Sequence, residues 1–129
     1  MWSTPDWEGE DTLTTKQLTA LTVEWKRRLR LMDWEVVVRF SPEKEVEGDG
    51  KTLYHKQLKI ANIQICDEGT FVGGCGVQEY DAEQILVHEL LHLHFPGFED
   101  GAPGHANHDK FETAIDLIAW GLVRAKRGV

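Results

Sequence analysis

The sequence has little of several features that would point to particular classes of protein. Two cysteines are too few for a disulfide framework, and no basic-then-apolar leader begins the chain, so we expect a reducing, cytoplasmic location. No apolar run reaches the ~20 residues of a transmembrane helix. Positive charge is also scarce, because 14 Lys and Arg residues face 22 Asp and Glu residues, for a net charge of −8. That balance disfavours tight nonspecific binding to nucleic acid or an anionic membrane.

The length of 129 residues suits one domain with one hydrophobic core. Residues 1–12 carry Trp2, Pro5 and Trp7 among acidic side chains and show no hydrophobic period, which predicts a flexible acidic tail. We expect residues 13–129 to form the single domain. Neither an internal repeat nor a low-complexity segment is present.

The first half of the domain predicts one helix and two strands. Thr14 begins the helix, with Gln17 three residues later as a capping box. Residues 34–40 and 58–66 alternate between apolar and polar side chains, as half-buried strands do. The charged, Gly-containing segment 41–51 reads as a turn region. We therefore expect a small mixed or antiparallel sheet, with 58–66 as an edge strand. The buried stripe of the helix is Leu18, Leu21, Trp25 and Leu29.

A second helix is predicted from Asp81 to Phe95. Asp81 is the expected N-cap, Gln84 completes a capping box, and Pro96 with Gly97 ends the helix. Apolar side chains cover almost every face of this segment. The helix should therefore be buried, and any polar side chain on it must be satisfied by a partner.

This buried helix contains the stretch His88-Glu89-Leu90-Leu91-His92, which spells H-E-x-x-H. Residues four apart on a helix lie on one face, so the two imidazoles converge on one point. Glu89 lies beside them, where a carboxylate can take a proton from a metal-activated water. Two core histidines held by hydrogen bonds are the simpler alternative. A bound metal explains all three polar side chains better.

A catalytic zinc site usually has three protein ligands and one open position. The candidates for the third ligand are His105, His108, Asp109 and Glu112. His94 follows His92 by only two residues, so it should point away from the pair.

A third helix, predicted at 107–126, favours Glu112 among these candidates. Asn107 is the expected N-cap, and Glu112 lies at the edge of the apolar stripe, where it can face the other helix. Asp116 lies one turn further along the same face, where a carboxylate can orient a ligating imidazole through its other ring nitrogen. The apolar stripe comprises Phe111, Ile115, Ile118 and Leu122.

His88-Glu89-x-x-His92 followed by Glu112 and Asp116 resembles the gluzincin metallopeptidase pattern, and the short chain is similar to the minigluzincins. The resemblance covers roughly residues 14–126. It implies a zincin-like α+β fold in which an H-E-x-x-H helix and a C-terminal glutamate helix supply the site. It also implies that His88, His92 and Glu112 bind Zn²⁺, that Glu89 is the general base, and that Asp116 supports a ligand.

The oxyanion-stabilising residue of larger gluzincins has no clear counterpart. Tyr54, Tyr80, His105 and His108 are the available candidates, and the sequence does not choose among them.

The expected function is a zinc-dependent metallopeptidase acting on a peptide or protein. An extended substrate could pair with the edge strand 58–66. Three alternatives stay open. One is a SprT-like, DNA-associated protease with His105 or His108 as third ligand. Another is a noncatalytic zinc-containing binding protein. The last is an ImmA/IrrE-like regulatory peptidase that cuts one repressor.

Overall fold

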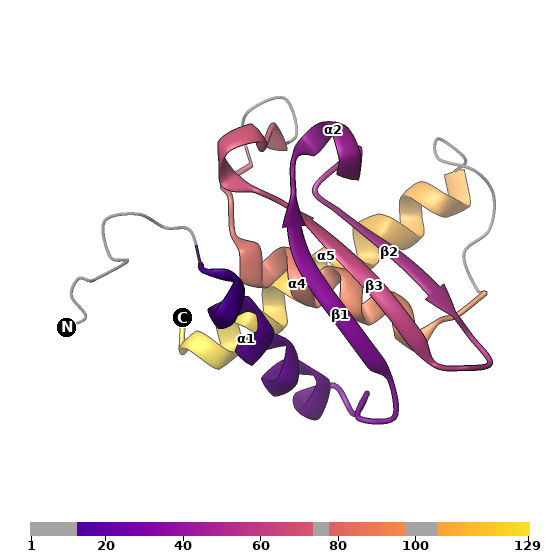
Figure 1. The fold of residues 1–129 in the computed structure, drawn as a ribbon. Coiled ribbons are helices and arrows are strands. Elements are labelled where there is room, and N and C mark those ends of the chain that lie inside the picture. The colour runs from indigo at the N-terminus through magenta and orange to yellow at the C-terminus, as the bar shows by residue number, and fades with distance from the viewer. Residues whose placement is uncertain (1–12, 74–77, 98–105) are drawn as a thin grey trace.

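The computed structural model describes residues 13–73, 78–97 and 106–129, which form an α+β fold with a small mixed sheet (Figure 1). The predicted tail, residues 1–12, lies outside the described residues. In chain order the elements are α1 (Thr15–Arg28), β1 (Glu35–Ser41), α2 (Glu43–Val46), β2 (Gly50–His55), β3 (Ile60–Cys66), the 3-10 turn η1 (Glu68–Thr70), α4 (Ala82–Leu91), the 3-10 turn η2 (His92–His94) and α5 (Ala106–Arg127).

The sheet has the order β1-β3-β2, so β3 is the central strand. β1 runs parallel to β3, and β2 runs antiparallel to it. The expectation that the strand at 58–66 lies at the edge is therefore wrong, because β2 occupies the edge nearest the H-E-x-x-H helix. No strand was predicted at this position. Gly50 and Lys51, at the end of the segment predicted as a turn, begin β2, and α2 lies within that segment.

Helices cover one face of the sheet. Figure 1 shows α4 and α5 behind the strands and α1 beside β1. Ala61, Ile63 and Ile65 point from β3 into the core, as the alternation predicted. On the opposite face Val37 and Leu53 stay largely exposed. The fold therefore has two layers, with its hydrophobic core between the sheet and the helices.

α4 begins as predicted, with the Asp81 side chain accepting a hydrogen bond from the backbone of Gln84. The reciprocal half of the predicted capping box is not formed, since the Gln84 side chain donates to Asp116 instead. α4 is buried on nearly every side, and the chain continues after Leu91 as the 3-10 turn η2. This turn keeps His92 on the same side of the chain as His88.

α5 packs against α4 through Ile115, Ala119 and Val123, which are buried. The prediction that Ile118 belongs to the core is wrong, because its side chain is 50% exposed. The expected N-cap Asn107 is also wrong, since it lies within the helix, which begins at Ala106. Glu112 and Asp116 lie on the side of α5 that faces α4.

An ion-pair network around Glu83 holds the C-terminal end of α5 against α1 and α4. Its carboxylate accepts hydrogen bonds from Trp25 Nε1 at 2.6 Å, Lys126 Nζ at 2.5 Å and Arg127 at 3.0 Å. The Glu83 side chain is only 10% exposed, so these partners offset the cost of burying its charge. The network ties together the two helices that carry the candidate site.

No helix among the described residues is both long and apolar enough to cross a bilayer.

Candidate metal centre

Three predicted ligands converge at one point: His88 lies on α4, His92 at the start of η2 and Glu112 on α5. Nε2 of His88 lies 2.9 Å from Oε1 of Glu112, and Nε2 of His92 lies 3.0 Å from Oε2. The potential ligand atoms of the three residues all lie within 4.8 Å of one another. His88, His92 and Glu112 therefore form a group that could hold a metal ion.

Asp116 fixes the orientation of His88, the interaction expected of it. Its Oδ1 lies 3.0 Å from His88 Nδ1 and also accepts a hydrogen bond of 2.8 Å from Gln84 Nε2. With Nδ1 bound to a carboxylate, Nε2 is the ring nitrogen that would bind a metal, which would replace its proton. Two imidazoles and one carboxylate are also a donor set that catalytic zinc sites use. The residues present thus fit zinc.

Charge coupling within the group is strong. Burial alone would lower the pKa of His88, but hydrogen bonds with Asp116 and Glu112 outweigh it and raise the pKa to about 10. Burial alone would raise the pKa of Glu112, but its hydrogen bonds with the two imidazoles hold the pKa of this carboxyl well below its ordinary value. The bond with His88 likewise lowers the pKa of Asp116. Two carboxylates therefore surround His88 with negative charge that suits a cation.

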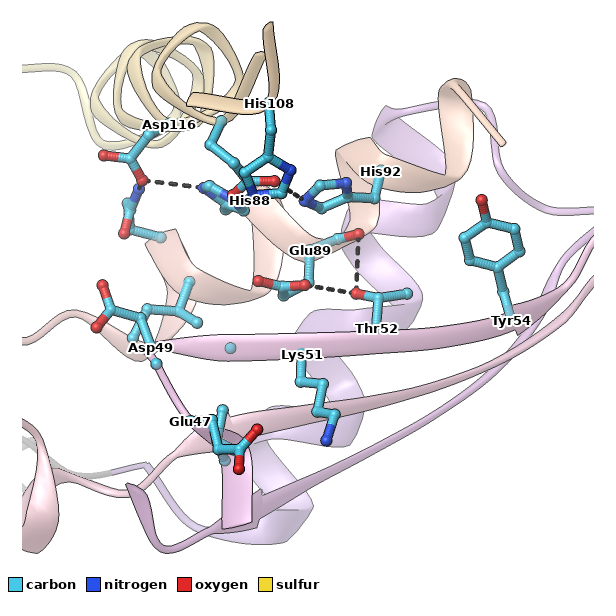
Figure 2. A pocket seen from close by; sticks show the side chains of 16 residues that line it. Glu47, Asp49, Lys51, Thr52, Tyr54, His88, Glu89, His92, His108 and Asp116 are labelled. Carbon is cyan, nitrogen blue, oxygen red and sulfur yellow. Dashed lines mark hydrogen bonds and ion pairs between the residues drawn. The ribbon is translucent and has the colours of Figure 1, made fainter. Parts of the chain in front are cut away.

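Glu89 lies below this group and faces the sheet (Figure 2). The residue is 5% exposed, and its Oε1 accepts a hydrogen bond of 2.6 Å from the hydroxyl of Thr52 on β2. Burial raises the pKa of Glu89, while the neighbouring His88 and His92 oppose that shift. The carboxylate is therefore both shielded from water and adjacent to the candidate ligands.

A pocket of about 520 Å³ opens over the group. β2 and the turn before it form one wall, where burial and the charge of Asp116 raise the pKa of Asp49. The lining includes Glu47, Asp49, Lys51, Thr52, Tyr54, His88, Glu89, His92, His108, Glu112 and Asp116. The cavity thus contains both the donor set and the proposed base.

The remaining candidates for the third ligand and for the oxyanion-stabilising residue differ in whether they line the pocket. His108 lines the pocket but is outside the group of converging donor atoms, and His105 lies outside the described residues. Tyr54 also lines the pocket, and its hydroxyl accepts a hydrogen bond of 2.8 Å from the backbone of Gly97. Tyr80 is not among the pocket residues, and its hydroxyl donates to the carbonyl of Cys66. His94 is exposed and is not one of the converging ligands, in agreement with the prediction that it points away from the pair.

Gly50, Thr52 and Asp49 were not predicted as site residues. They belong to or precede β2, whose approach to α4 depends on contacts far away in the sequence. The alternation in Thr52-Leu53-Tyr54-His55, rich in strand-forming residues, was the available signal.

Comparison of the chain with family models, with curated proteins and with solved structures finds no match.

Proposed function

We propose that this chain is a zinc-dependent metallopeptidase of the gluzincin type. The observation that carries the proposal is the convergence of His88, His92 and Glu112 in a pocket that also contains the buried carboxylate of Glu89. Zinc bound there would activate a water molecule and polarise the carbonyl of the scissile bond.

Glu89 has the placement of a general base. It follows the first imidazole directly in sequence and lies in the same pocket, and burial makes its carboxylate more basic than an exposed one. It would accept the proton of the attacking water at its carboxylate. The same group would then deliver that proton to the departing amine.

β2 offers a surface for an extended polypeptide. It is the outer strand on its side of the described sheet, and Lys51, Thr52 and Tyr54 on this strand line the pocket. A peptide that adds to the sheet as a further strand would place a backbone carbonyl over the metal group. This arrangement favours a polypeptide substrate. It replaces the earlier hypothesis that the strand at 58–66 binds the substrate.

Cleavage of a proteome-derived peptide library, read by mass spectrometry, tests the proposal. We expect the zinc-loaded protein to cleave peptides and Glu89→Gln to lose ~100-fold or more of that activity, since general acid–base catalysis contributes ~10²–10⁴-fold. Zinc content should be equal in the two proteins. Glu45→Gln, the same change on the exposed side of α2, is the matched control and should keep full activity.

Two outcomes would contradict the proposal. Full activity in Glu89→Gln would show that Glu89 is not the general base. Bound zinc with no cleavage of any peptide by the unmodified chain would favour the noncatalytic zinc-containing binding protein.

A further inference from the structure

Both oxygens of the Glu89 carboxylate contact the same edge strand. The Thr52 hydroxyl donates to Oε1 at 2.6 Å, and an added Cβ at Gly50 would lie 2.7 Å from Oε2. Gly50 and Thr52 are two residues apart on β2, so they point to the same face of the sheet, which here is the face toward α4. Figure 2 shows the bonds from Thr52 to Glu89 across the gap between strand and helix.

The hydroxyl of Thr52 has few alternative orientations. A β-branched side chain on a strand is restricted at χ1, so the oxygen is held in place before the carboxylate binds it. Its second contact, with the backbone oxygen of Glu89, is longer at 3.4 Å. The bond to the carboxylate is the stronger of the two, because it is shorter and its acceptor is charged.

The close approach of Glu89 to β2 also restricts which residue can stand at position 50. A Cβ there would also lie 2.8 Å from Cγ of Glu89 and 2.9 Å from Cγ2 of Ile85, well inside van der Waals distance. No L-residue with a side chain fits at this point unless both Glu89 and Ile85 move. The close approach of β2 to α4 thus depends on glycine at position 50.

We propose that Thr52 and Gly50 are positioning residues for the catalytic base. Thr52 holds one oxygen of Glu89 by its hydroxyl, and Gly50 leaves the space that the other oxygen occupies. Without the hydroxyl, the buried carboxylate would lose its bond to β2 and could turn toward the neighbouring imidazoles. A base displaced by about 1 Å can cost ~100-fold in rate. This inference rests on the proposed function for its effect on catalysis, but not for its effect on structure.

The test combines kinetics with crystal structures of the zinc-loaded protein. Thr52→Val keeps the shape and strand preference of threonine and removes only the hydroxyl. We expect kcat to fall ~10- to 100-fold with KM within about twofold and zinc content unchanged. The crystal structure should show the Glu89 carboxylate displaced or divided between conformers. Thr52→Ser should restore most of the turnover and the original position.

Two further variants complete the design. Gly50→Ala should displace Glu89 and slow turnover with Thr52 intact. Thr22→Val removes another buried hydroxyl, one that donates to the Leu18 carbonyl on α1, and should leave kcat unchanged. This control separates loss of positioning from general loss of a buried hydrogen bond.

Failure of the positioning role and failure of the proposed function give different results. Unchanged turnover in Thr52→Val, or slower turnover with an unmoved Glu89, would overturn the positioning role. If the unmodified chain cleaves nothing, the proposed function fails. The crystal structures still decide the placement of Glu89: an unmoved carboxylate in Thr52→Val overturns the inference, and a displaced one supports it.

Discussion

Nδ1 of His88 lies 3.0 Å from Oδ1 of Asp116, and the other ring nitrogen of the same imidazole lies 2.9 Å from Glu112. Asp116 thus orients the imidazole ring of His88 so that its other nitrogen faces Glu112. Because Asp116 follows Glu112 by four residues, a single helix face supplies both groups.

Asp116→Ala should weaken zinc binding by ~10- to 100-fold, since carboxylates that hold a ligating imidazole typically contribute that much to affinity. Competition with a chelator of known affinity measures the change. Asp109→Ala removes an exposed carboxylate from the first turn of the same helix and should leave the affinity unchanged. Equal affinities in the two variants would show that Asp116 does not support the metal site.

Of the two tyrosines, Tyr54 is the one that lines the pocket. Its hydroxyl accepts a hydrogen bond from Gly97, so its own proton can be donated to a developing oxyanion in the pocket. We expect Tyr54→Phe to lower kcat on the order of 10- to 100-fold at constant zinc content. Tyr80→Phe, which removes a hydroxyl from a residue outside the pocket lining, should cost ~1 kcal/mol of stability without slowing turnover. Unchanged turnover in Tyr54→Phe would exclude this role.

Glu83 should make the stability of the fold sensitive to acid. Burial alone would raise its pKa, but hydrogen bonds from Lys126, Trp25 and Arg127 outweigh burial and hold the pKa below the ordinary 4.5. A depressed folded-state pKa means that the stabilisation is fully present above the unfolded-state value and is lost as the pH falls through the folded-state value. Glu83→Gln should cost ~2–3 kcal/mol at neutral pH, and that difference should shrink in acid.

Urea unfolding of the two proteins from about pH 7 down to pH 3 measures this difference. Glu45→Gln, at an exposed position, should follow the unmodified protein throughout. A constant gap between the Glu83→Gln curve and that of the unmodified protein would mean that the charge of Glu83 contributes no stability.

Much of the site could be predicted because its geometry is local to helices. The four-residue spacings of His88 with His92, and of Glu112 with Asp116, place each pair on one helix face whatever the rest of the fold does. The cap of α4 at Asp81 is equally local, since it involves a bond between residues three apart. The apolar stripe of α5 indicated that Glu112 can face the other helix, and the family resemblance implied that it binds the metal. The structure brings the two faces together.

The parts that were missed depend on long-range pairing. β2 is an edge strand only because β1 and β2 flank β3, and nothing in the 50–55 segment alone specifies that order. The roles of Gly50 and Thr52 follow from the contact of β2 with Glu89, 37 residues away from Thr52. Ile118 fits the apolar period of α5, but the helix buries a neighbouring stripe of side chains in the core. Periodicity does not decide between neighbouring stripes.

Zinc content, measured by elemental analysis after exhaustive dialysis, decides whether Glu112 is the third metal ligand. The proteins compared are the unmodified chain, Glu112→Ala and His108→Ala. We expect one zinc per chain in the unmodified protein and in His108→Ala, and loss of zinc in Glu112→Ala. Retention of zinc in Glu112→Ala with loss in His108→Ala would contradict this expectation and favour the SprT-like ligand set.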